Sequence, residues 1–236
     1  MPKIITISCP PPVVERHGNI VVVRDDYLEG GTKQAALVDV LPRLNVQEVV
    51  YASPVYGYAQ VALAIVCRDL GMRATIFCAA RRTPHRLTQR AISAGANVVQ
   101  VPVGYMSVVR CRATEYCNRT GATLLPFGLD TDEMRSEIAV RAKHVQYDPQ
   151  EVWCVAGSGT LTRALQDAWP AAKHYAVRIG AEPSVGRADV YVAPEKFEQD
   201  AKRPPPFPSC RNYDAKAWRF VLEHAKSGAL FWNVAR

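Results

Sequence analysis

Residues 21–37 read VVVRDDYLEGGTKQAAL, and the rest of the chain is interpreted outward from this stretch. A β-branched run ends in two acids, and the glycine pair Gly30 and Gly31 then precedes Thr32 and Lys33. Glycines permit a tight backbone turn that larger residues would block. Thr32 suits the N-cap position, which would place Lys33 in the first turn of a helix.

The position of Lys33 has a chemical consequence. The positive end of a helix macrodipole disfavours an ammonium group, which helps to keep a lysine amine neutral and nucleophilic. Neutral lysine amines form Schiff bases with carbonyl compounds. The alternative is an exposed lysine that opens a surface helix, and this stretch alone does not decide between the two.

The composition limits the classes of protein that the chain can represent. Its 236 residues, 48% of them hydrophobic, can bury the core of one globular unit or two small lobes. No apolar run is long enough to span a membrane, and the first ten residues do not form a signal peptide. The seven cysteines are scattered, without CxxC spacing, so neither a zinc site nor a disulfide framework is indicated. We expect a cytoplasmic protein with reduced thiols, no metal site and no membrane association.

The chain carries a formal net charge of +7, which suits a polyanionic partner or anionic small molecules. Several basic residues lie close together in the sequence, namely Arg81, Arg82, His85, Arg86, Arg90, Arg110 and Arg112. A solvated helix face explains such a group, and contact with nucleic acid is the alternative. His85 and His144 are both expected at the surface of basic helices.

Short apolar runs alternate with helical patterns along the whole chain. Strands are predicted at residues 4–8, 20–24, 49–53, 74–78, 97–101, 123–127, 152–156, 175–178, 190–192 and 229–234. Helices are predicted at residues 33–44, 57–70, 84–94, 107–119, 131–145 and 213–226, with another one after residue 160. This alternation predicts parallel strands joined by crossover helices, and therefore an α/β layered fold.

A second motif follows the apolar strand at residues 152–156. Gly157, Ser158, Gly159 and Thr160 form a glycine-rich turn that leads into a helix. Free backbone N–H groups at such a helix start bind anions readily. Glycine is also common in strand-to-helix turns for purely structural reasons, so the motif by itself leaves phosphate binding open.

Taken together, the motifs carry a family resemblance. The segments that carry it are RDD at 24–26 with GGTK at 30–33, AQVALA at 59–64, GMRATIF at 71–77, AGANVV at 94–99, GSGT at 157–160, RIGAEP at 178–183 and NYDAKA at 212–217. The chain resembles the fold-type II pyridoxal-phosphate enzymes of the tryptophan synthase β-like superfamily. It looks closest to the branch of aminocyclopropane-carboxylate deaminase and D-cysteine desulfhydrase.

The resemblance covers nearly the whole chain and implies an α/β fold of three layers, with parallel sheets flanked by helices in two intertwined lobes. We expect residues 1–236 to form a single compact pyridoxal-phosphate enzyme unit. The small lobe would span approximately residues 48–127, and the remainder would form the large lobe.

The resemblance also implies roles for individual residues, with pyridoxal 5′-phosphate as the cofactor. Lys33 would be the Schiff-base lysine and catalytic base, and Tyr213 would be a catalytic group that faces the substrate. Asp214 would pair with the ring nitrogen, and the cofactor phosphate would be bound by Gly157, Ser158, Gly159 and Thr160. Core packing for Tyr213 and an acid in a first helical turn for Asp214 are the alternatives. Asp25 and Asp26 are expected to brace the turn.

The chain departs from the family at the loop that holds the substrate carboxylate, which usually reads SGNHAQ. The matching residues are Tyr56, Gly57, Tyr58, Ala59 and Gln60, with glycine in place of asparagine. Tyr56, Gly57 and Tyr58 are the predicted substrate-binding residues, and a hydrophobic rim is the alternative for the tyrosines. The chain is also shorter than most of the family, and residues 183–208 look trimmed.

These features predict a pyridoxal-phosphate-dependent lyase that acts on an amine or amino-acid-like substrate by deamination, elimination or decarboxylation. One alternative is an enzyme of phage DNA hypermodification, working in the host cytoplasm on an aminoacyl-modified nucleobase. The altered loop, the short chain and the positive charge motivate that alternative and a possible nucleic-acid partner. The other alternative is a non-catalytic pyridoxal-phosphate-binding protein, although such a protein would tend to lose Lys33 or the phosphate loop. We expect a homodimer.

Overall fold

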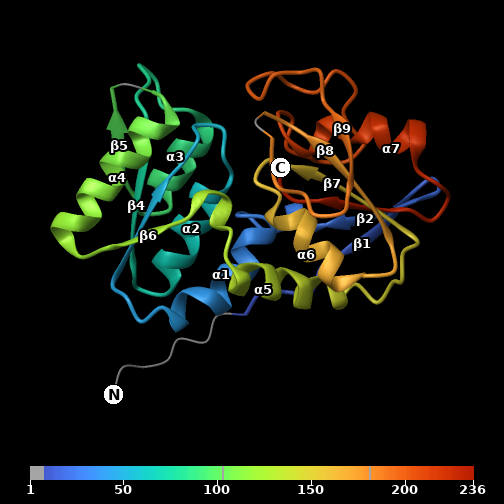
Figure 1. Ribbon diagram of the computed structural model, residues 1–236, viewed down its shortest axis with the longest axis horizontal. Helices are drawn as coiled ribbons and strands as arrows, with labels where there is room; N and C mark the ends of the chain where they lie inside the picture. Colours follow the sequence, from blue (N-terminus) through green and yellow to red (C-terminus); the bar gives the residue numbers. More distant parts are fainter. Residues whose placement is uncertain (1–7, 103, 181) are drawn as a thin grey trace. The chain divides into compact units, whose positions relative to one another are not determined.

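The computed structural model describes residues 8–102, 104–180 and 182–236, and the chain divides into two compact units (Figure 1). Lys33–Leu129 form one of them, which we call the inserted unit. Pro10–Thr32 and Asp130–Arg236 together form the other, which we call the split unit. The chain therefore leaves the split unit at Thr32 and returns to it only after the inserted unit has been formed.

The inserted unit is built on a sheet of four parallel strands in the order β5-β4-β3-β6. Its strands are β3 (Glu48–Ala52), β4 (Arg73–Ala79), β5 (Asn97–Val101) and β6 (Thr123–Leu125). Its helices are α1 (Thr32–Arg43), α2 (Ala59–Asp69), α3 (Arg86–Ser93) and α4 (Met106–Thr120), followed by the short 3₁₀ helix η2 (Phe127–Leu129). Helix α1 begins at Thr32 itself, one residue earlier than predicted.

The order of these strands decides which face each helix covers. From β3 to β5 the chain advances across the sheet in one direction, and α4 then carries it back to β6 beside β3. Right-handed crossovers therefore put α4 on the face opposite α2 and α3, as Figure 1 shows. Val50 and Ala52 of β3 pack against Val109 and Ala113 of α4 in one buried cluster.

The split unit has a six-stranded sheet in the order β1-β2-β10-β7-β8-β9, in which only β1 is antiparallel to its neighbour. Its strands are β1 (Val14–His17), β2 (Ile20–Arg24), β7 (Glu151–Ala156), β8 (Lys173–Arg178), β9 (Asp189–Val192) and β10 (Leu230–Asn233). Its helices are η1 (Asp25–Tyr27), α5 (Asp132–Lys143), α6 (Thr160–Ala168), η3 (Asp214–Lys216) and α7 (Trp218–His224).

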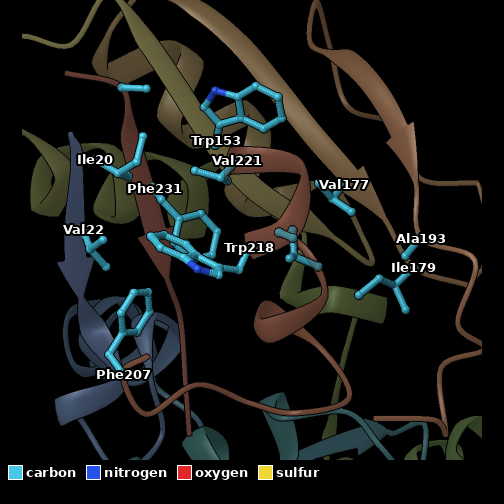
Figure 2. Close-up of a cluster of buried hydrophobic side chains, with 13 residues drawn as sticks. Ile20, Val22, Trp153, Val177, Ile179, Ala193, Phe207, Trp218, Val221 and Phe231 are labelled. Carbon is cyan, nitrogen blue, oxygen red and sulfur yellow. The ribbon is translucent and has the colours of Figure 1, made fainter. Parts of the chain in front are cut away.

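Side chains alternate along these strands and fill two cores, one on each face of the sheet. Cys154 and Trp232 point toward α5 and α6. Trp153 and Phe231, their neighbours in sequence, point to the other face, where they join Trp218 of α7 (Figure 2). Both faces of the central strands are therefore buried, which is why β7 and β10 read as continuous apolar runs.

The predicted α/β fold with parallel sheets flanked by helices is confirmed, and three local predictions need comment. The strand predicted at residues 4–8 falls mostly outside the described residues, and Ser8 is not in a strand. The hairpin strand β1 was not predicted. The helix predicted at residues 213–226 is broken, because Tyr213 has non-helical angles and η3 precedes α7. Within the described part of the chain, no helix has the length and hydropathy of a membrane span.

Candidate active site

The sheet of the split unit reverses direction beside β7. Strands β7, β8 and β9 follow one another across the sheet, and β10 then returns to lie between β2 and β7. In open parallel sheets, ligands bind beyond the carboxyl ends of the strands at such a switch point. The loop Gly157–Thr160 follows β7 at this point, and Val234 and Ala235 follow β10.

The loop after β7 has the features of an anion cradle. Gly159 adopts a positive φ of 83°, and a Cβ there would collide with the carbonyl oxygen of Ser184, so only glycine fits. The hydroxyl oxygens of Ser158 and Thr160 lie 3.0 Å apart, and Thr160 is the buried first residue of α6. The hydroxyls of Ser158 and Thr160 therefore lie at the start of a helix, where backbone N–H groups attract anions.

Asp214 is fully buried beside the end of β10. Its Oδ2 accepts a hydrogen bond from the backbone N–H of Ala235 at 3.2 Å, whereas Oδ1 has no hydrogen-bond partner among the described residues. Burial raises the pKa of this carboxyl group well above its usual range. A buried carboxylate oxygen without a partner is costly, so the site calls for a donor that carries positive charge.

Tyr213 connects Asp214 to the loop after β7. Its hydroxyl accepts a hydrogen bond from the backbone of Gly157, and a Cβ at Gly157 would come within 2.9 Å of that hydroxyl. Burial, and then the negative charge of Asp214, raise the pKa of the Tyr213 hydroxyl far above its usual value. The phenol therefore stays protonated at neutral pH, so its oxygen accepts from Gly157 while its O–H keeps a proton that it can donate.

The acids before Lys33 brace the turn, as expected. Both guanidinium donors of Arg24 bind Asp26 at 2.8 and 2.9 Å, and Asn233 of β10 donates to the same carboxylate at 2.8 Å. Asp25 is buried and pairs with Arg141 of α5 at 2.7 Å. The hydrogen bond from Asn233 fastens the segment to β10, and the ion pair with Arg141 fastens it to α5.

The residue before Lys33 is also fixed to β10. Trp232 donates its indole N–H to the hydroxyl of Thr32 at 2.8 Å, and both side chains are buried. Gly31 has a φ of 67°, and a Cβ there would collide with the carbonyl oxygen of Val234. The backbone that delivers Lys33 is thus held against the strand whose end contacts Asp214. Lys33 is half-buried and lies in the first turn of α1.

A separate loop follows β3 in the inserted unit and contains the predicted substrate-binding residues. The amide nitrogen of Gln60 donates to the carbonyl oxygens of Val55 and Gly57 at 3.1 and 3.0 Å, from a fully buried position. A Cβ at Gly57 would lie only 3.1 Å from the carbonyl oxygen of Pro54. The loop is therefore closed tightly around Gln60, and a side chain at position 57 would be crowded.

The two tyrosines of this loop pair with arginines. Arg81 donates to the Tyr56 hydroxyl at 2.9 Å, and Arg90 donates to the Tyr58 hydroxyl at 2.5 Å. Each guanidinium also lies near the ring of its tyrosine, 5.1 and 5.3 Å from the centroids. His85 meets the Tyr56 ring edge-on at 4.9 Å and is half-buried rather than fully exposed.

The structure thus sorts the predicted residues into groups. Within the split unit it brings together Gly157, Ser158, Gly159, Thr160, Tyr213 and Asp214. Within the inserted unit it brings together Tyr56, Gly57 and Tyr58. The sequence reasoning missed Asn233, and it also missed Lys216, whose buried ammonium donates to the carbonyl oxygen of Lys196 at 2.7 Å and fixes the backbone at that residue. A polar residue inside an otherwise apolar strand was the only signal for Asn233.

No protein-family model matches the sequence, and no curated protein matches it either. Solved structures do match its fold. An ACC deaminase homologue superposes with a TM-score of 0.83 at 12% identity, over 96% of this chain and 90% of its own. A hydrogen sulfide-producing enzyme from Fusobacterium nucleatum gives 0.69 at 13% identity, covering 92% and 80%. Diaminopropionate ammonia lyase from Escherichia coli gives 0.64 at 13% identity, covering 92% and 78%. The chain therefore shares the fold of these enzymes, with the parallel sheets flanked by helices that the resemblance led us to expect.

Proposed function

We propose that this chain is a pyridoxal-phosphate-dependent enzyme of the lyase class that acts on an amino-group substrate. The observation that carries the proposal is the unpartnered Oδ1 of buried Asp214, at the same switch point as the anion cradle. A deaminase homologue and an ammonia lyase among the structural neighbours support the same reaction class.

The residues fit the two polar ends of the cofactor. A phosphate dianion suits the hydroxyls of Ser158 and Thr160 together with the backbone N–H groups at the start of α6. A protonated ring nitrogen would give Asp214 Oδ1 the cationic donor that it lacks. Lys33 is the residue to which we assign covalent attachment through its Nζ. When bound, pyridoxal phosphate supplies an electron sink for negative charge that develops on the substrate.

The chain's own side chains would then divide the remaining work. Lys33 Nζ, in the first turn of α1, takes a proton from the substrate as a neutral amine and returns it as an ammonium. Asp214 is shielded from water and would favour the protonated form of a cofactor ring nitrogen placed beside it. Tyr213 remains a neutral phenol, and its O–H would donate a hydrogen bond to the substrate without a change of charge.

A titration of the purified protein with pyridoxal phosphate tests this proposal. We expect a new visible absorbance band, and release of ammonia or a 2-oxo acid from at least one member of a panel of D- and L-amino acids. A protein that gains no colour with added cofactor would refute the cofactor assignment.

A second candidate function concerns the substrate. Gly57 provides no side chain for a substrate carboxylate, and the space around it is restricted by Pro54. We therefore also propose that the substrate is a larger amine, carried on an aminoacyl-modified nucleobase. The enzyme would act on it as a homodimer in the cytoplasm. Mass spectrometry of a modified oligonucleotide after incubation, with light scattering for the dimer, tests this candidate. Rapid turnover of a small free amino acid with an unchanged oligonucleotide would rule it out.

A further inference from the structure

One part of the inserted unit contains arginines and no acids. Between Asp69 and Glu115 the sequence has neither aspartate nor glutamate. The same stretch contains seven arginines, namely Arg73, Arg81, Arg82, Arg86, Arg90, Arg110 and Arg112. This local excess equals the formal net charge of +7 of the whole chain, so the positive charge is concentrated here.

The fold gathers part of this stretch against the loop after β3. Because β3 and β4 are neighbouring parallel strands, the loops that follow them lie at the same edge of the sheet. The result is a group that we call the arginine–tyrosine cluster. Hydrogen bonds and ring contacts join Tyr56, Tyr58, Arg81, His85 and Arg90. Arg86 is the sixth member, because its charge acts on His85.

The cluster presents positive charge to the solvent. Arg81 and Arg90 donate to the phenol oxygens of Tyr56 and Tyr58. Arg81, its neighbour Arg82 and Arg86 are exposed. The pKa of His85 is lowered by burial and then by the charges of Arg86 and Arg81, so His85 itself is neutral and experiences a positive field.

We propose that the arginine–tyrosine cluster binds a single-stranded nucleic acid. Phosphodiester groups contact Arg81, Arg82, Arg86 and Arg90, and bases stack on the paired tyrosine and guanidinium groups. Arginines interleaved with aromatic rings are the combination that single-stranded binding surfaces use. An acidic protein as the partner would require the positive charges of the arginines but would not require the tyrosine rings. The proposal deepens the second candidate function and does not depend on the cofactor.

Fluorescence anisotropy with a labelled single-stranded oligonucleotide, in the absence of pyridoxal phosphate, tests the proposal. Four phosphate contacts predict a slope of about −2.8 in a plot of log K against log salt, which is roughly a 50-fold loss of affinity from about 50 to about 200 mM salt. No binding at low salt, or equal affinity for polyglutamate, would overturn the proposal.

A pair of matched charge reversals locates the surface. Arg82→Glu/Arg86→Glu should weaken binding at least tenfold and reduce the magnitude of the salt slope by about 1.4. Arg203→Glu/Arg211→Glu is the control, because both arginines are highly exposed residues of the split unit and the net charge changes equally. The control should retain its affinity within about twofold. Equal losses of affinity in both variants would show that binding depends only on the net charge of the protein, and would overturn the proposal for this cluster.

Two further measurements separate this proposal from its alternatives. Thermal unfolding of each variant checks that the fold is retained, and Arg86→Lys should preserve most of the affinity. Uptake of pyridoxal phosphate by the Arg82→Glu/Arg86→Glu variant should match that of the wild type. A failed oligonucleotide titration with normal cofactor uptake would overturn only the nucleic-acid proposal, whereas the reverse result would overturn only the cofactor assignment.

Discussion

Replacing Asp214 with asparagine tests the cofactor assignment most sharply. The substitution preserves the shape of a fully buried side chain and removes its ability to carry charge. Hydrogen bonds to charged groups contribute about 1.5–3 kcal/mol, so the apparent Kd for pyridoxal phosphate should rise roughly 10- to 150-fold. An absorbance titration at neutral pH measures this change directly.

The same substitution should not destabilise the cofactor-free protein, although it weakens cofactor binding. The folded-state pKa of Asp214 is raised by burial, so its contribution is fully present below the ordinary aspartate pKa and is lost as pH rises through the raised value. Asparagine does not ionise. The free energy of unfolding of Asp214→Asn should therefore equal or exceed that of the wild type at neutral pH, and it should decline less as pH rises.

Asp189→Asn provides the control, because this carboxylate belongs to the same unit and is well exposed beside Lys173. It should alter neither the Kd nor the pH dependence measured by chemical denaturation. Wild-type cofactor affinity in Asp214→Asn would refute the pairing with the ring nitrogen. A large loss of stability in the cofactor-free variant would instead make the carboxylate a structural group.

Three further variants probe the residues around this site. After borohydride reduction, intact-mass spectrometry should detect a covalent cofactor adduct on the wild type and none on Lys33→Ala, and an adduct that persists in the variant would move the attachment to another lysine. Gly159→Ala should lower the free energy of unfolding by more than Gly180→Ala; both positions have positive φ, worth about 1–2 kcal/mol, but only Gly159 faces a backbone carbonyl oxygen. Arg141→Gln should cost about 3–5 kcal/mol in urea denaturation because it leaves buried Asp25 without its ion pair, and a loss below about 1 kcal/mol would contradict this interpretation.

The sequence predicted most of the fold because most of the parallel strands read as short, largely apolar runs between helical patterns. Strands β2 and β5 were predicted with the bounds that the structure has. Strand β1, in contrast, reads VERH and lies at a half-exposed edge, so it shows no apolar run. The break after Tyr213 was also missed, because its cause lies in tertiary contacts. The backbone there is fixed by hydrogen bonds to Cys210, whose own N–H donates to Ala235.

The candidate site was predicted in part, and the division has a physical basis. The glycines of the loop after β7 leave a local signal, since a turn with positive φ requires glycine. The partners of Asp26 and Tyr56 leave none, because Asn233 lies 207 residues from Asp26 and Arg81 lies 25 residues from Tyr56. Such contacts are created by the strand order, which no local pattern encodes.

The position of β10 between β2 and β7 has a consequence for the order in which the protein can form during synthesis. Thr32 emerges from the ribosome 200 residues before Trp232, the partner of its hydroxyl. Until then β2 and β7 lack the strand that joins them, whereas every strand of the inserted unit has already been made. Pairing over such long sequence separations is slow and leaves strand edges open to aggregation. We therefore expect the inserted unit to acquire protease resistance on nascent chains first, and Asp214, which contacts the end of β10, to become ordered last.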